Sequence, residues 1–320
     1  MPGINSRNDD NNNIFPQTLL FGNGLYRCYG ENSWNSFLTG LCQRDDLPDD
    51  LENDLNSPMT LKSQLISNGN IKSALEKTDR KFFGILDNNE LRETIRKILS
   101  VGFDDIITTN YDYRLEIAAT DKVTITKSFL DSHARNIIKG RSVEPKYLLQ
   151  SYQSVKYKGV ENRVWHIHGE AKKQDSMILS LYYYSKLLAR IIGHSGKNKN
   201  CFFNAQASNR TPQIRSWIDS FILGDIYILG FGFDYSEIDL WWLLERKNNE
   251  KAKHGKIYYY EPVSENNEKV KLLKLFGAEV INFNMSVPEN NKNEFYLEFY
   301  QKALESIINN IKSKNKEAVK

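Results

Sequence analysis

Short hydrophobic runs recur along the chain, and longer segments with helical spacing separate them. Each run has four or five residues, mostly Ile, Leu, Val, Tyr or Phe, which is typical of strands buried on both faces of a parallel sheet. The alternation predicts an α/β fold: a Rossmann-like open parallel sheet of about six strands, with helices on both faces. The predicted strands are Thr18–Phe21, Asp105–Thr108, Arg163–Ile167, Asp225–Leu229, Lys256–Tyr260 and Glu279–Phe283.

The sequence predicts more helices than are needed to connect the six strands of this sheet. Asp87 is predicted to cap the helix that precedes the second strand. Tyr182–Ile192 and Thr211–Phe221 are predicted helices, separated by a polar loop at His194–Asn200. Together with residues 45–85, they predict a smaller helical lobe inserted over the ligand edge of the sheet.

Three regions are expected along the chain. Residues 1–13 are polar and rich in Asn and Asp, which predicts a disordered tail. Residues 14–290 form one predicted catalytic domain. Residues 291–320 predict an amphipathic helix with a basic tail, whose apolar stripe is expected to cover the domain's own core.

The composition excludes several classes of protein. Lys+Arg 43 against Asp+Glu 40 gives a net charge of +3, which is too balanced to favour nucleic-acid binding. Three cysteines without a C-x-x-C pair cannot build a four-thiolate zinc site or a disulfide framework. No apolar run approaches the roughly 18 residues of a membrane span. We therefore expect a cytoplasmic protein.

Four short motifs follow predicted strands, at the edge where open parallel sheets bind ligands. The first is Gly22-Asn23-Gly24. Glycines there let the backbone approach a pyrophosphate, and the following helix adds favourable amide dipoles. Glycines also make ordinary tight turns, so both interpretations remain open.

The second motif contains Thr109, Asn110 and Asp112. An amide and a carboxylate two residues apart can hydrogen-bond ribose hydroxyls and orient a water molecule. The same residues could begin a helix as its cap and first turn. The two roles are compatible.

The third motif is His166-Ile167-His168-Gly169. Imidazole is the usual general base near neutral pH, and a following glycine leaves room for substrate beside it. We therefore predict a catalytic role for His168 and a structural role for His166. An H-x-H metal pair is disfavoured because no third ligand lies at a suitable spacing, so no metal site is predicted.

The fourth motif, with Gly230, Gly232 and Asp234, is a second glycine turn into a helix. It suits the other end of a dinucleotide, or simple turn geometry. Glu261 follows the fifth predicted strand and could accept hydrogen bonds from the adenine-ribose hydroxyls. Alternatively, Glu261 is a solvent-exposed residue before Pro262 without a role in binding.

In this order, the four motifs resemble the sirtuin (silent information regulator) superfamily, and most closely the bacterial sirtuin-like domains of anti-phage defence effectors. The resemblance spans about residues 17–285. The start of that branch, G-N-G-[IL]-x-R…S-W, and the family's T-x-N-[IYF]-D and catalytic His-Gly have counterparts here. They are Gly22-Asn23-Gly24-Leu25 with Arg27 and Ser33-Trp34, then Thr109–Asp112, and then His168-Gly169.

The departures from the family pattern concern the peptide substrate. Protein-deacylating sirtuins carry a four-cysteine zinc module and an F-G-E segment that pairs with the peptide, and neither has a counterpart here. Tyr26 stands where their G-x-G-[IV]-S motif has serine. The resemblance therefore implies hydrolysis of NAD⁺ to nicotinamide and ADP-ribose. The alternatives are a non-catalytic NAD⁺ or ADP-ribose sensor, a protein deacylase, and an ADP-ribosyltransferase.

The resemblance also implies roles for single residues, with NAD⁺ as substrate and no metal. Asn110 would hold the nicotinamide ribose and the attacking water, Asp112 would orient the ribose or stabilise positive charge, and His168 would act as general base. The expected NAD⁺-binding residues are Gly22, Asn23, Gly24, Arg27, Thr109, Gly230, Gly232, Asp234 and Glu261.

An enzyme that depletes NAD⁺ in an infected cell must be kept inactive until it is needed. The resemblance therefore implies a homo-oligomer, a controlling partner protein, or both. A HerA-type DNA translocase or a short Argonaute is the partner that the family suggests. Direct nucleic-acid binding and membrane association are not expected.

Overall fold

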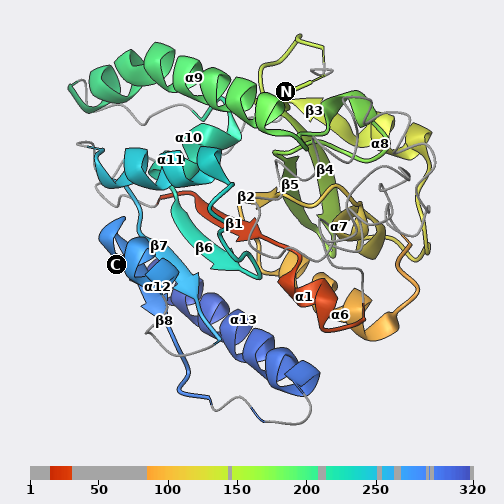
Figure 1. Ribbon diagram of the computed structural model, residues 1–320. Coiled ribbons are helices and arrows are strands. Elements are labelled where there is room, and N and C mark those ends of the chain that lie inside the picture. Colours follow the sequence, from red (N-terminus) through yellow and green to blue (C-terminus); the bar gives the residue numbers. More distant parts are fainter. Residues whose placement is uncertain are drawn as a thin grey trace, which may run out of the picture.

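A computed structural model describes residues 15–30, 85–142, 146–207, 214–250, 254–262, 268–285, 288 and 292–317. One mostly parallel sheet runs through it in the order β3-β4-β5-β2-β1-β6-β7-β8 (Figure 1). The predicted α/β class is therefore confirmed, with eight strands instead of about six. The strands are β1 (Gln17–Phe21), β2 (Asp105–Thr108), β3 (Ala134–Asn136), β4 (Ser151–Tyr157), β5 (Val160–His166), β6 (Asp225–Leu229), β7 (Ile257–Tyr260) and β8 (Ala278–Ile281).

The two strands that the sequence did not predict form an antiparallel edge. β4 pairs antiparallel with both β3 and β5, while β5 pairs parallel with β2. A two-residue turn joins β4 to β5, and Lys158 and Gly159 both have positive φ there, as hairpin turns of this length require. Along β4, buried residues alternate with more exposed ones. A half-buried strand carries no continuous hydrophobic run, so the pattern used for the other strands could not find it.

The order in which the chain adds strands to the sheet reverses at β1, in the centre of the sheet. β1 lies between β2 and β6 and pairs parallel with both. The chain first builds outward from β1 through β2 and β5, and then returns to build the other half from β6. Ligands of open α/β sheets bind at such a switch point, outside the carboxyl ends of the strands. The loops that follow β1 and β6 meet there.

Helices cover both faces of this sheet (Figure 1). Alternate strand residues point to opposite faces, so Leu19 and Phe21 lie in one hydrophobic core and Leu20 in the other. The helices around the first core are α1 (Gly24–Arg27), α6 (Asn89–Ser100), α7 (Arg114–Ala118), α8 (Lys127–His133) and α13 (Lys292–Glu317). Those around the second are α9 (Leu181–Ala207), α10 (Trp217–Leu223), α11 (Ile238–Asn248) and α12 (Glu268–Leu275).

Two helix predictions need correction. The cap of α6 is Asn88, whose side chain accepts from the amide of Leu91 at 3.0 Å, and not Asp87. The predicted loop at His194–Asn200 is wrong, because α9 continues through it. The side chain of His194 reaches Asp219 at the start of α10, 3.0 Å away, and this tertiary contact outweighs the low helix propensity of the neighbouring glycines.

The predicted lobe and termini are described only in part. The described parts of that lobe are α9, which packs on α10 and α11, and α10 itself, which begins at Trp217 and not at the predicted Thr211. Residues 1–13 and 45–84 lie outside the described residues. The apolar stripe of α13 is buried against the first core, and Lys314 pairs with Asp225 of β6 at 2.8 Å. Among the helices that the structure describes, none is long and apolar enough to cross a membrane.

Candidate active site

The four sequence motifs follow four adjacent strands of the sheet, β5, β2, β1 and β6. Backbone hydrogen bonds join their loops in pairs. The amide of Gly22 donates to the carbonyl of Leu229 at 3.0 Å, and the amide of Ile167 donates to the carbonyl of Thr108 at 3.0 Å. The structure therefore brings these segments, far apart in sequence, to one edge of the sheet.

The glycines of the two glycine turns are needed where the loops after β1 and β6 pack together. A Cβ atom on Gly22 would lie 2.3 Å from the carbonyl oxygen of Gly230, and Gly230 itself has a φ of +68°. The amide of Gly24 donates to the same carbonyl at 2.8 Å. These glycine amides are thus engaged within the protein, and the predicted contact with a pyrophosphate depends on other donors of the loops.

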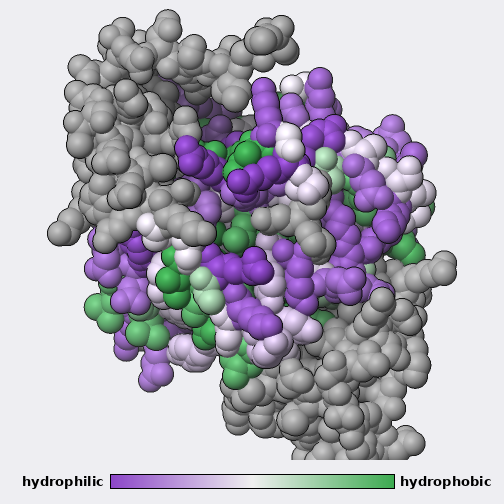
Figure 2. Space-filling model, turned by 90° about the horizontal axis from the view of Figure 1, so that it is seen from above, coloured by the Kyte–Doolittle hydropathy of each residue, from purple (hydrophilic) through white to green (hydrophobic). Residues whose placement is uncertain are grey.

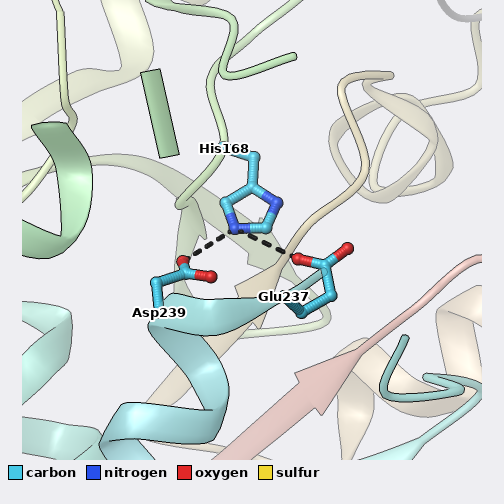
Figure 3. Close-up of side chains that lie close together, drawn as sticks. All are labelled: His168, Glu237 and Asp239. Carbon is cyan, nitrogen blue, oxygen red and sulfur yellow. Dashed lines mark hydrogen bonds and ion pairs between the residues drawn. The ribbon is translucent and has the colours of Figure 1, made fainter. Parts of the chain in front are cut away.

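His168 lies just beyond β5, buried among polar side chains of two helices. Its Nε2 atom is 2.9 Å from Oδ2 of Asp239 and 3.7 Å from Oε2 of Glu237, both at the start of α11 (Figure 3). The Tyr184 hydroxyl of α9 is 3.3 Å from Nδ1 of His168 and donates to Glu237 at 3.2 Å. Because the tyrosine hydroxyl gives its hydrogen to Glu237, its oxygen can accept a hydrogen bond from Nδ1 of His168. Both ring nitrogens of His168 then face acceptors, an arrangement that suits a protonated imidazole.

The environment of His168 raises its pKa as well as that of Glu237. Burial alone lowers the pKa of His168, but the carboxylates of Asp239 and Glu237 raise it, and the net pKa lies above the ordinary value. Burial raises the pKa of Glu237 to about 7, with the imidazole of His168 opposing that rise. The second oxygen of Asp239 is buried without a hydrogen-bond partner in the described structure. His168, Glu237 and Asp239 thus form one buried cluster of acid and base side chains.

Gly169 fixes the position of the chain at His168. Its φ is +102°, and a Cβ atom there would lie 2.3 Å from the carbonyl oxygen of Ser176, at the end of a short 3-10 helix (Gln174–Ser176). The room beside this glycine is therefore filled by the protein itself, and not left for substrate as the sequence analysis expected. The carbonyl of His168 also accepts from the amide of Ile178 at 2.8 Å.

His166 has a different set of partners. Its Nε2 atom is 2.9 Å from Oε1 of Glu116 on α7, and its Nδ1 atom is 2.9 Å from the carbonyl oxygen of Asn110. Burial lowers the pKa of His166, but Glu116 outweighs it and raises the pKa to about 9. The two histidines thus have separate carboxylate partners, and His166 ties β5 to α7 and to the loop after β2.

The loop after β2 places its polar side chains beside this segment. Nδ2 of Asn110 is buried and makes no hydrogen bond of full geometry among the described residues, although the side chain lies beside the hydroxyl of Tyr26. The carboxylate of Asp112 accepts from the amide of Arg114 at 2.9 Å and pairs with its guanidinium at 3.0 Å, so it does stabilise the start of α7. The hydroxyl of Tyr111 donates to the carbonyl of Ile178, which adjoins His168 through the backbone.

The remaining predicted NAD⁺-binding residues lie at the rim of this edge. Arg27 and Gly232 are exposed, and Asn23, Thr109 and Glu261 are half-buried. The exposed carboxylate of Asp234 accepts from the amide of Ser236 at 2.9 Å, and so shapes the turn into α11. Their contacts with NAD⁺ stay predictions.

Three side chains of this site, those of Tyr184, Glu237 and Asp239, belong to none of the four sequence motifs. The two carboxylates stand 69 and 71 residues after His168, too far for a spacing rule, although two acidic residues at a helix start just after a glycine turn were a usable signal. One ligand atom from each of His168, Glu237 and Asp239 lies within 4.8 Å of the others, an arrangement that could hold a metal ion. The expectation of no metal site therefore needs a direct test.

Comparison with known proteins places this edge in a family. No curated protein matches the chain. The sequence model of a family described as SIR2-like domain matches residues 104–281, which contain Asn110, His168 and Asp239. The match is narrower than the resemblance inferred from the motifs, because it begins after the first glycine turn. It covers more than half of the chain, and the protein therefore belongs to the SIR2-like domain family, which marks it as an NAD⁺-consuming enzyme.

Proposed function

We propose that this protein is an NAD⁺ glycohydrolase, which cleaves the bond between nicotinamide and ribose. Water adds to the anomeric carbon of the ribose, the electron pair of the broken C–N bond neutralises the pyridinium nitrogen, and one proton is released. The products are nicotinamide and ADP-ribose. The observation that carries the proposal is the buried His168, held between Tyr184 and two carboxylates at the ligand edge of the sheet.

His168 is the proton acceptor in this reaction. A buried imidazole at this edge can take the proton from the attacking water or from a ribose hydroxyl. Asp239 orients the ring and stabilises the imidazolium that forms, as buried carboxylates do beside catalytic histidines. Negative charge in the same group also favours the positive charge that develops on the ribose as nicotinamide leaves.

Asn110 is the proposed contact to the nicotinamide ribose. A buried donor without a partner destabilises a protein by about 1–3 kcal/mol, so such a group is expected to meet a ligand. A ribose hydroxyl or the attacking water would satisfy it. Asp112, oriented by Arg114, would add negative charge nearby.

The rest of the dinucleotide would lie along the switch point. The turns with Gly22, Asn23 and Gly24 and with Gly230 and Gly232 meet there, which supports binding of the pyrophosphate and the adenosine half at this edge. Arg27, Thr109, Asp234 and Glu261 are the polar side chains proposed to complete that contact.

The biological role is proposed from the resemblance to bacterial defence effectors. Depletion of NAD⁺ would stop growth of an infected cell, and a homo-oligomer or partner protein would keep the enzyme inactive beforehand. Three cysteines cannot supply the four thiolates of a deacylase zinc module, which supports hydrolysis over protein deacylation.

The test is to incubate the purified chain with NAD⁺ and to follow nicotinamide and ADP-ribose by chromatography. Equimolar release is expected, and Asn110→Ala and His168→Ala should each lower its rate by about 10²–10⁴-fold. His133→Ala, a histidine on α8 away from the ligand edge, serves as the matched control and should retain the parent rate.

Two results would contradict the proposal. The first is full release by His168→Ala. The second is tight NAD⁺ binding without release, combined with expression in cells that is harmless for the parent and for His168→Ala alike. That second combination would identify a sensor. Toxicity of the parent that His168→Ala relieves would instead show an enzyme that lacks its activator in the purified state.

A further inference from the structure

The outer side of α9 carries a pocket that is separate from the candidate active site. Its volume is about 610 Å³, within the range of roughly 300–1,000 Å³ typical of small-molecule sites. The lining combines positive charge with aromatic rings: it consists of Lys146, Tyr147, Tyr182, Tyr183, Lys186, Ala189 and Arg190. Neither Asp nor Glu is among these described lining residues.

Among the residues that the structure describes, no carboxylate neutralises the positive charges of this pocket. In the part of the chain that the structure describes, Lys146, Lys186 and Arg190 form no ion pair with a carboxylate. Cations gathered without counter-charge repel each other and attract anions. The pocket is therefore suited to a ligand with several negative charges.

The tyrosines hold these cations in place and add a second kind of contact. Lys146 lies 3.7 Å from the ring centroid of Tyr183, Lys186 lies 4.1 Å from that of Tyr182, and the guanidinium of Arg190 lies 4.6 Å from that of Tyr147. Such cation–π contacts order flexible side chains. Aromatic rings beside cations are also the means by which proteins bind a nucleobase next to its phosphates. Lys186 covers one face of the Tyr182 ring and donates to its hydroxyl, and because Tyr182 is 58% exposed the rest of its ring surface is open for stacking.

We propose that this pocket binds a free nucleoside polyphosphate. The base stacks on a tyrosine ring, with Tyr182 the most accessible, and the phosphates bind Lys186, Arg190 and Lys146. A bare inorganic anion would make no use of the rings, and Ala189 is the only aliphatic side chain in the lining for an apolar partner. A net charge of only +3 over the whole chain also argues against a long nucleic-acid track.

The pocket shares a helical turn with the candidate active site. Tyr182 and Tyr183 line the pocket, while the next residue, Tyr184, turns inward and contacts His168.

Hydrophilic side chains cover most of the described surface in the view from above, and hydrophobic ones appear in small groups between them (Figure 2). The inference does not depend on NAD⁺ hydrolysis, because it concerns a different surface.

The experiment measures ATP binding to the full chain by calorimetry, and variants of the pocket separate binding there from binding at the candidate active site. The double variant Lys186→Glu with Arg190→Glu should bind ATP at least about tenfold more weakly, since two charge-assisted contacts are lost. The charge-matched control, Lys97→Glu with Lys127→Glu, changes exposed residues of α6 and α8 and should bind like the parent. Tyr182→Ala should weaken ATP binding more than it weakens the binding of inorganic tripolyphosphate, because it removes the stacking ring as well as one contact of Lys186.

Several results would overturn the proposal. One is equal ATP affinity in the parent and the Lys186/Arg190 variant, and another is no ATP binding at millimolar concentration. Tripolyphosphate binding as tightly as ATP would show an anion site without base recognition. A ten-nucleotide oligo(dT) that binds where ATP does not would show a site for single strands. None of these results bears on nicotinamide release, so failure here is distinguishable from failure of the proposed hydrolase.

Discussion

His166 and His168 are two residues apart, yet they lie in opposite chemical situations. His166 has one carboxylate, Glu116, and one main-chain carbonyl, and both of its nitrogens are satisfied. His168 has two carboxylates and a tyrosine hydroxyl. Each site leaves one carboxylate oxygen without a partner in the described structure, on Glu116 and on Asp239. The first arrangement therefore pairs the imidazole with one carboxylate, whereas the second surrounds it with two.

This difference shows that the residue type alone does not decide the role of a histidine. His166 faces α7, whose carboxylate closes the site, and His168 faces the starts of α9 and α11, where Glu237 remains 17% exposed. Surplus buried charge usually destabilises a fold, so it tends to be found where chemistry requires it. If His168 is the reactive histidine that we propose and His166 a structural one, their variants should differ in the ways predicted below.

The largest effect is expected from His168→Gln on the rate of nicotinamide release. Glutamine keeps a donor for Asp239 but cannot act as a base, so the rate should fall by about 10²–10⁴-fold while the melting temperature stays close to that of the parent. His166→Gln should affect the rate far less. An equal loss of rate in both variants, with both still folded, would remove the distinction.

The next effect concerns stability, and it should appear in His166→Ala. This change leaves Glu116 buried without its partner, which should lower the free energy of unfolding by about 3–5 kcal/mol. Urea unfolding followed by circular dichroism measures it, with His133→Ala as the control. A loss below about 1 kcal/mol would show that the pair with Glu116 is not structural.

The same pair should make stability depend on pH. The pKa of His166 is raised to about 9 in the folded protein, above the ordinary value of 6.5. Its stabilising contribution is therefore fully present below pH 6.5 and is lost as the pH rises through 9, with a magnitude of at most about 3 kcal/mol. Unfolding curves between pH 6 and 10 should show this decline, and Glu116→Gln should flatten it. A decline that persists in Glu116→Gln would assign it to other groups.

Asp239→Asn should lower the rate less than His168→Gln does, because the imidazole of His168 is still present and keeps a polar neighbour. Loss of this carboxylate also removes the largest influence that raises the pKa of His168. Activity falls when His168 is protonated, so the acidic limb of the pH–rate profile should move to lower pH in the variant. A limb that stays in place would mean that Asp239 does not set the protonation of His168.

The smallest expected effect is that of a chelator. His168, Glu237 and Asp239 could hold a metal ion, but the proposed reaction needs none. Nicotinamide release should therefore be unchanged after treatment with EDTA and gel filtration. Loss of the rate, with recovery on adding one divalent metal, would give these three residues a different role.

Much of the fold followed from the sequence, for a physical reason. Strands such as β1 and β6 are buried on both faces, so their hydrophobic runs are continuous and easy to recognise. β4 is half exposed and lost that signal. The interior of α9 was also misjudged, because the contact of His194 with Asp219 is tertiary and leaves no mark in the local sequence.

The candidate site was only half predictable. Short motifs pointed to Asn110 and His168, because a few polar residues after a buried strand stand out. The partners of His168 come from α9 and α11, and no local pattern connects Tyr184 or Asp239 to it. The prediction singled out suitable glycines but could not foresee that Gly22 and Gly230 would pack against each other.

The central position of β1 also has a consequence for how the protein is made. Gln17 on β1 contacts Asp225 on β6 across 208 residues of sequence. At about 5–20 residues per second, a ribosome needs roughly 10–40 s to supply the second neighbour of that first strand. During that interval a strand that is buried along its whole length in the folded protein has one side unpaired, and contacts so distant in sequence form slowly. Folding of this enzyme is therefore expected to benefit from chaperones, and an interrupted chain should not acquire its activity.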